Sequence, residues 1–513
     1  MWRSFFRNAL SNVGGTLVGL VVGFVTMPLV VHHLGATQFG IWVLASGLTG
    51  YLGVLDLGLS PTLVNETAAL LARDDASARR RLAETTSTIF ALYGLLGALG
   101  GLVLAVLGGA AGAIFQVPAD DLGTFRLVLF VVGLQTALGL PMSVWSGLLS
   151  GLQAFHVLNA IGVATTLARG ALTVGLVLSG YGLVALVVAS FGVTLAGWAV
   201  ACTCAYRRIP GLSVRLANCR RSRLTDVGRF SMAMVVWTIA GAALHQLDRV
   251  LIGAILPLAA LTIYEVGARL SNYSRAVLHS WLSVVMPATS ALAARGERGR
   301  LRALFLRTTR YLLTSYGGVA VVLIGLGRPL VRLWMGPAFD ESWIVMCLLV
   351  AGSLVQSQNV VAHVMLPGMG ELRVFTRFMA VYPVVTAACA VAGILQGGLI
   401  GLAAGMSVSM LIMETIFLMT IVRSRFALPL GRVFTRCHLP ALKALAPVVL
   451  WVGAAQARAP IDSWPVLAGV AIVAGIVFVA GVWTGALTPG ERRALRERVA
   501  ARLRTPAPRL EVA

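Results

Sequence analysis

Long apolar segments recur along nearly the whole chain, and they limit how it can fold more than any other feature. A helix needs roughly 20 mostly apolar residues to cross a membrane, and runs of that length follow one another with short charged or Gly/Pro-containing breaks. Only 12% of the 513 residues are charged, whereas soluble domains carry about 25%. The sequence therefore predicts an all-α integral membrane protein with about fourteen transmembrane helices.

The expected spans begin and end where apolar runs meet charged or turn-forming residues. They are Ala9–Val31, Phe39–Leu59, Thr86–Phe115, Phe125–Leu149, Val157–Leu178, Leu183–Tyr206, Arg229–Leu256, Leu261–Leu292, Tyr311–Met335, Trp343–Leu366, Phe375–Leu395, Ile400–Val422, Leu439–Ala457 and Trp464–Leu487.

Basic residues gather in alternate connections, which sets the orientation. The connections after the second, sixth, eighth, tenth and twelfth spans hold most of the arginines, as do both ends of the chain. The positive-inside rule then places both termini in the cytoplasm. The net charge of +22 is spread over these loops rather than gathered in one basic domain, so a nucleic acid partner is not expected.

The arginine-rich connection between the sixth and seventh spans divides the chain into two similar halves. A faint repeat, LGATQFGIW against LPLAALTIY, follows the first span of each half. The predicted parts are a six-helix lobe at 1–206, a cytoplasmic loop at 207–228, a second six-helix lobe at 229–422, two extra helices at 423–487 and a basic cytoplasmic tail at 488–513, with a disordered end.

Charged residues inside spans are costly, so they are candidates for a ligand site. A central Arg, Lys or Asp costs about 2.5–3.5 kcal/mol on insertion scales. The eighth span carries one stripe of such residues, because steps of three and four stay on one helix face. These are Glu265, Arg269, Asn272, Arg275 and His279.

Neighbouring spans add His245, Asp248 and Arg249 in the seventh and Arg169 in the fifth. Two interpretations stay open for several of them. Glu265 and Arg269 can neutralise one another at i, i+4, Asp248 can pair with a neighbouring arginine, and Arg249 can snorkel outward. Arg169 and Arg275 have no acidic residue at helical spacing, which favours a functional cavity. The histidines are interpreted as satisfied interior side chains or supporting polar groups.

Two further acids have alternative interpretations. Asp56 lies with Gly58, Ser60 and Pro61 at the inner end of the second span, where Gly and Pro break or kink a helix. This segment is either a gate or a simple kink. Glu414 is a lone acid in the twelfth span, either shielded by packing or acting as a proton site.

Two stretches resemble the polysaccharide-export flippases of the multidrug/oligosaccharidyl-lipid/polysaccharide (MOP) exporter superfamily. The segment PLVVHHLGATQFGIWVLASGLTGYLGVLDLGLS, residues 28–60, is similar to the opening pattern of that family. The segment LHQLDRVLIGAILPLAALTIYEVGARL, residues 244–270, is similar to the Asp-Arg-aliphatic stretch that opens its second half. The fourteen-span layout extends the resemblance over essentially the whole chain.

The resemblance implies two six-helix lobes around a central cavity, in a bacterial cytoplasmic membrane, that flip polyprenyl-pyrophosphate-linked oligosaccharide between leaflets. Arg169, Arg249, Arg269, Asn272 and Arg275 would then bind substrate. Polysaccharide assembly proteins are candidate partners.

Three alternatives are weighed against this function. A multidrug exporter would favour acidic and aromatic cavity residues, and a lipid II flippase would carry charges along its first helix, which this chain lacks after Arg7. A membrane enzyme would need a long catalytic loop outside the membrane. No nucleophile, metal or phosphate-loop motif appears, so neither a catalytic residue nor a cofactor is expected.

Overall fold

The structure is a computed structural model of the 513-residue chain. It describes residues 2–57, 59–73, 75–110, 114–219, 239–242, 244, 246–458 and 460–504. Every regular element in these ranges is a helix, which confirms the all-α prediction. The chain divides into two compact units, unit 1 at Met1–Glu265 with Thr376–Gly405, and unit 2 at Val266–Phe375 with Met406–Ala513.

Unit 1 is built from long helices that pack side by side, with short 3₁₀ turns between some of them. Its main elements are α1 (Trp2–Leu34), α2 (Ala36–Leu52), η1 (Gly53–Asp56), α3 (Leu59–Arg73), α4 (Ala76–Gly109), η2 (Ala119–Asp121), α6 (Leu122–Gly151), α7 (Phe155–Leu178), α8 (Leu183–Arg208) and η3 (Leu216–Asn218), followed by helical residues 246–255 and the first turns of α10 (Leu258–Ala294).

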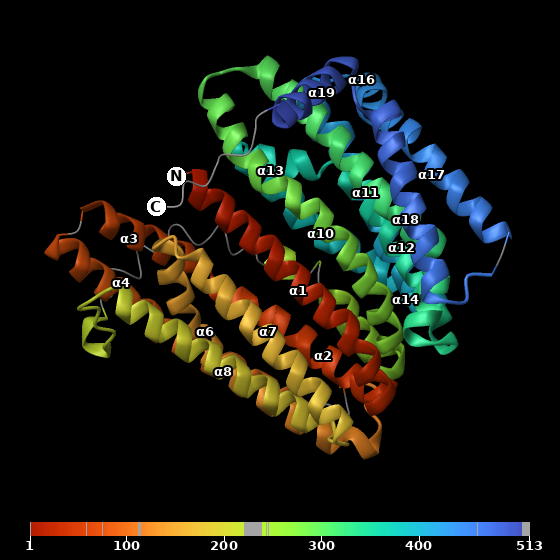
Figure 1. Ribbon diagram of the computed structural model, residues 1–513. Coiled ribbons are helices and arrows are strands. Elements are labelled where there is room, and N and C mark those ends of the chain that lie inside the picture. The colour runs from red at the N-terminus through yellow and green to blue at the C-terminus, as the bar shows by residue number, and fades with distance from the viewer. Residues whose placement is uncertain are drawn as a thin grey trace. The chain divides into compact units, whose positions relative to one another are not determined.

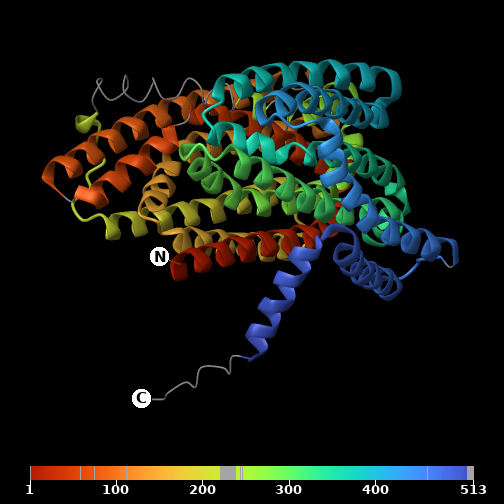
Figure 2. The same ribbon diagram turned by 90° about the horizontal axis from the view of Figure 1, so that it is seen from above.

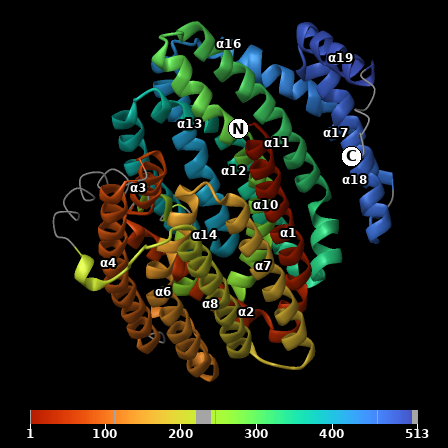
Figure 3. The ribbon, with the colours of Figure 1, turned by 60° about the vertical axis from the view of Figure 1, so that its left-hand side comes forward.

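Small residues set the packing inside unit 1. Figures 1 and 3 show α4 running alongside α6. A Cβ added at Gly101 would lie 2.6 Å from the carbonyl oxygen of Gly133, and one at Gly97 would lie 2.7 Å from that of Ala137. These glycines let the two backbones approach closely, as is common between helices in membranes. The helices α4 and α6 therefore form a closely packed pair in this unit.

Unit 2 contains the rest of α10 and most of the later helices. They are α11 (Arg298–Met335), η4 (Pro337–Phe339), α12 (Asp340–Ser357), α13 (Val360–Gly368), α14 (Leu372–Phe417, whose residues 376–405 belong to unit 1), η5 (Leu418–Val422), α15 (Arg423–Phe426), α16 (Leu430–Val433), η6 (Phe434–His438), α17 (Leu439–Arg458), α18 (Trp464–Gly481), η7 (Val482–Ala486) and α19 (Pro489–Arg504). Figure 2 shows α19 as the last helix before the C-terminus.

One long helix reverses direction where the sequence predicts a break between two spans. Gly397 and Gly398 in α14 have non-helical backbone angles, with φ of −136° and +54°. The two arms then approach so closely that a Cβ at Gly393 or Gly401 would clash with the carbonyl of the other. The expected eleventh and twelfth spans are therefore the two arms of a hairpin.

Eleven helices in the described residues are long and apolar enough to cross a membrane, which confirms a multi-pass protein. They include α14 as one segment, and α10 is not among them. Much of the expected seventh span lies outside the described residues. The count of fourteen spans and the lobe boundaries stay predictions.

Candidate functional site

Arg249, which lies on the helical stretch at 246–255, belongs to an enclosed group of charged side chains in unit 1. Its Nη2 donates to Glu265 Oε2 at 3.0 Å, its Nε donates to the same oxygen at 3.3 Å, and its Nη1 donates to Gln246 Oε1 at 2.8 Å. The side chains of Arg249 and Glu265 are only 15% and 8% exposed. Arg249 is therefore held by a carboxylate from α10 and does not point freely outward.

Two glycines of α2 make room for this network. A Cβ at Gly47 would lie 2.9 Å from Cδ of Arg249, and one at Gly50 would clash with the Gln246 side chain. Asp248 lies beside the network, where its carboxylate accepts from the backbone N–H of Arg249 at 2.9 Å and from the Tyr264 hydroxyl. Every polar member of the group thus has a partner, as buried charge requires.

The stripe predicted on α10 continues into unit 2. Arg275 is half-buried, and its Nη2 donates to Gln356 Oε1 at 3.4 Å. Asn272 is exposed, and Arg269 is half-buried with contacts of its own. The structure therefore places Arg269, Asn272 and Arg275 on one helix. The side chains of His245 and His279 lie outside the described residues.

Arg169 lies on α7 in unit 1, well separated in sequence from the other candidates. It is exposed, and its Nη2 donates to the hydroxyl of Thr194 on α8 at 3.0 Å. Both Arg169 and Arg275 thus contact a neutral group, and within the described ranges neither has a carboxylate partner. Both are cations in predicted spans, and among the described residues only neutral groups contact their guanidiniums.

The break expected near Asp56 is present, and a side chain that sequence reasoning missed holds it together. The 3₁₀ turn η1 ends at Asp56, and Leu57 adopts a left-handed φ of +49°. Asp56 Oδ1 accepts from Ser60 Oγ at 2.6 Å and from the hydroxyl of Tyr93 on α4. No spacing pattern pointed to Tyr93, because it lies 37 residues away.

Glu414 is fully buried at 0% exposure in unit 2. Its Oε2 accepts from Asn359 Nδ2 at 2.9 Å and lies 3.4 Å from His363 Nε2, while the ring of Phe417 stands edge-on to His363. Its Oε1 has no hydrogen-bond partner in the described part of the chain. The residue is shielded by packing, and its acceptor capacity is only partly used. Both of its interpretations therefore stay open.

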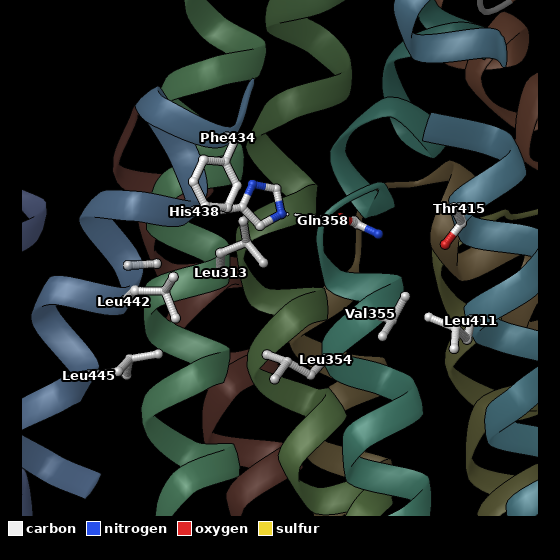
Figure 4. A pocket seen from close by; sticks show the side chains of 11 residues that line it. Leu313, Leu354, Val355, Gln358, Leu411, Thr415, Phe434, His438, Leu442 and Leu445 are labelled. Atoms are coloured by element: carbon white, nitrogen blue, oxygen red, sulfur yellow. Dashed lines mark hydrogen bonds between the residues drawn. The ribbon is translucent and has the colours of Figure 1, made fainter. Parts of the chain in front are cut away.

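A mainly apolar pocket of about 360 Å³ lies among α11, α12, α14, η6 and α17. Leucines of α11, α12, α14 and α17 line it, and Phe434 lies beside the ring of His438 (Figure 4). Its polar corner is a contact of 3.1 Å between His438 Nε2 and Gln358 Oε1. The lining suits hydrocarbon, with one place for a polar contact.

The chain is similar in sequence to a known protein family and to one relative. A family model described as polysaccharide biosynthesis protein matches residues 5–293, more than half of the chain. A candidate O-antigen transporter of Shigella flexneri is 20% identical over 156 residues, which are 30% of this chain and 36% of that protein. The chain thus matches about a third of the length of that relative.

Two solved structures show the same fold at low identity. Lipid II flippase MurJ in an inward closed conformation is 11% identical, with a TM-score of 0.67, covering 93% of this chain and 99% of that chain. An inward-facing multidrug resistance MATE family transporter of the MOP superfamily is 14% identical, with a TM-score of 0.66, covering 82% and 98%. The chain therefore belongs to the polysaccharide biosynthesis protein family, and it has the fold that these two solved structures share.

Proposed function

We propose that this protein is a flippase for an oligosaccharide linked to polyprenyl pyrophosphate. It moves the lipid-linked sugar from the inner to the outer leaflet of a bacterial cytoplasmic membrane by alternating access. Membership of the polysaccharide biosynthesis family and the likeness to a candidate O-antigen transporter support this substrate class. The likeness to MurJ supports the fold on which such a function would operate.

The observation that carries the proposal is the pair of intramembrane guanidiniums with neutral partners. Arg169 contacts only the hydroxyl of Thr194, and Arg275 contacts only the amide of Gln356, among the hydrogen bonds and ion pairs that the described residues make. Such a charge is costly in a membrane and marks a ligand path. Arginine also makes forked, charge-assisted hydrogen bonds to phosphate oxygens. An anionic pyrophosphate headgroup would supply the missing counter-charge.

Replacing Arg275 tests this directly. Cells that lack the native gene are complemented with Arg275→Gln or Arg275→Lys, and lipid-linked saccharide is measured in each leaflet. Loss of a hydrogen bond to a charged group costs about 1.5–3 kcal/mol, so the Gln variant should flip roughly ten- to a hundredfold more slowly. The Lys variant keeps the charge but not the fork, and its rate should lie between those of the Gln variant and wild type.

Arg126→Gln is the matched control, because Arg126 is exposed at the start of α6 and is not among the candidate ligands. It should export normally at equal protein level. Normal flipping by both Arg275→Gln and Arg169→Gln would contradict the assigned ligand site. Unchanged saccharide distribution after deletion of the protein, together with new sensitivity to cationic drugs, would instead favour a multidrug exporter.

A further inference from the structure

A second group of basic side chains lies in unit 2, away from the stripe on α10. It surrounds a pocket of about 390 Å³ formed by α11, the α16–η6 segment and the start of α19. Four arginines line this pocket with a single carboxylate, that of Glu491. The arginines are Arg307, Arg310, Arg432 and Arg436. Its volume is within the range of about 300–1,000 Å³ that is usual for ligand sites.

Glu491 is fully engaged by the protein. It forms a capping box at the start of α19, where Thr488 donates its backbone N–H at 2.9 Å and its hydroxyl at 2.8 Å to Oε2. Arg310 Nη2 donates to both carboxylate oxygens at 2.7 Å, and Arg307 Nε lies 3.1 Å from Oε1.

The environment keeps this carboxylate ionised. Burial alone would raise the pKa of Glu491, but hydrogen bonds from Thr488 and Tyr311 and the charge of Arg310 outweigh it and lower the pKa to about 2. Its single negative charge is therefore permanent near neutral pH, and its acceptor sites are already in use.

Positive charge remains after Glu491 is counted. Arg310 is only 7% exposed, and its Nε has no hydrogen-bond partner among the residues that the structure describes. Arg432 and Arg436 are exposed and lie four residues apart, so they share one helix face. Neither guanidinium makes a hydrogen bond or ion pair within the described ranges. The pocket is therefore strongly cationic and lacks its counter-ion.

The surroundings of the pocket indicate that the anion belongs to a lipid. Phe434, which lies between the two exposed arginines, is 51% exposed, and Leu442 on the following helix is 55% exposed. An apolar surface thus begins beside the basic pocket. The distribution of arginines in the sequence places this end of the helices on the cytoplasmic side, where anionic headgroups attract basic residues near the membrane surface.

We propose that this pocket binds the phosphate headgroup of an anionic phospholipid of the inner leaflet. Arg432 and Arg436 bind the phosphate, and the buried Arg310 forms the inner end of the pocket. The acyl chains lie along the exposed apolar residues of η6 and α17. The bound lipid ties α16 and η6 to α11 and to the first turn of α19. This site is separate from the arginines proposed to bind the transported lipid.

Native mass spectrometry of the purified full-length protein tests the proposal. The protein is incubated with phosphatidylglycerol or phosphatidylcholine. The number of lipid molecules that stay bound is then counted as the collision energy is raised. Arg432→Gln/Arg436→Gln should bind phosphatidylglycerol roughly thirtyfold more weakly, since each near-surface arginine contributes roughly fivefold. Phosphatidylglycerol should also raise the unfolding temperature of wild type but not of this variant. In detergent without lipid the two proteins should unfold at the same temperature.

Arg298→Gln/Arg423→Gln is the matched control, because both residues are exposed, lie on the same predicted side and do not line the pocket. It should bind phosphatidylglycerol as wild type does. Equal binding by the two double variants would overturn the proposal. So would stabilisation by inorganic pyrophosphate without any by phosphatidylglycerol vesicles, since the anion would then be a soluble one.

Discussion

At the scale of single residues, the arginines of the membrane helices differ in what faces their charge. Arg249 is bound by Glu265 and Gln246, whereas Arg275 meets only an amide. Sequence spacing allows Glu265 to pair with Arg269, and the structure shows that the carboxylate also binds Arg249, which is 16 residues earlier on another helix. Periodicity describes one helix at a time, so it identifies which residues are unusual but not which partner from another helix they meet.

Glu265→Gln should destabilise the protein by about 3–5 kcal/mol, because removing one partner leaves a guanidinium in an enclosed site. Unfolding in detergent, followed by tryptophan fluorescence, measures this loss. Arg300→Gln removes one partner of a surface pair with Glu297, in which the arginine is 74% exposed, and should cost less than about 1 kcal/mol. Equal losses in the two variants would show that the Arg249 pair is no more important than a surface pair.

At the scale of elements, the sequence locates a helix end that glycines set and misses one where charged turns extend the helix. The reversal in α14 falls between the two predicted spans, at Gly397 and Gly398. By contrast, α4 begins at Ala76, ten residues before the predicted span at Thr86. The Asp75 side chain caps it by accepting from Ala78 N–H at 2.6 Å. Hydropathy misses this extension because those turns carry arginines and leave the apolar run.

Gly401→Ala should weaken the α14 hairpin, because its Cβ would clash with the carbonyl of Gly393 and the backbones would have to separate. Overpacking of this kind costs about 1–3 kcal/mol. Gly397→Ala is the control, since it has open space and a φ of −136° that other residues adopt. Thermal unfolding of both variants measures the difference. An Ala at 401 that is as stable as one at 397 would argue against close contact of the two arms.

At the scale of the whole molecule, the structure confirms the predicted class of protein, whereas the orientation and the number of spans stay predictions. Apolar length identifies most crossing helices, and the alternation of arginines assigns their ends to the two sides. The charged helix α10 is also predicted, since the expected span Leu261–Leu292 lies close to its bounds of Leu258–Ala294. Hydropathy does not predict the partner of each charge, such as Arg249, which lies 3.0 Å from Glu265 of this helix.

Orientation can be tested with single cysteines, one in the first turn of α4 and one in the connection that follows α4. In a variant without the six native cysteines, Asp120→Cys should react with an impermeant maleimide in intact cells, because its connection is predicted to be external. Ser77→Cys should react only after permeabilisation, because it lies beside arginines that are predicted to be cytoplasmic. Both positions are exposed, so access depends on the side of the membrane. The reverse pattern would invert the topology.

The contacts of Glu491 with Arg310 and Thr488 decide where the C-terminal segment can be shortened without loss of stability. The segment from Thr488 onward is rich in arginine, which gives no sign on its own of a structural role. Cutting before Thr488 would remove Glu491, the carboxylate that Arg310 binds in the described part of the chain, and leave that buried guanidinium beside three other cations. A tag placed after the last residue, by contrast, leaves that acid in position. Glu491 at the start of α19 therefore anchors α11 through Arg310, which lies 181 residues earlier in the chain.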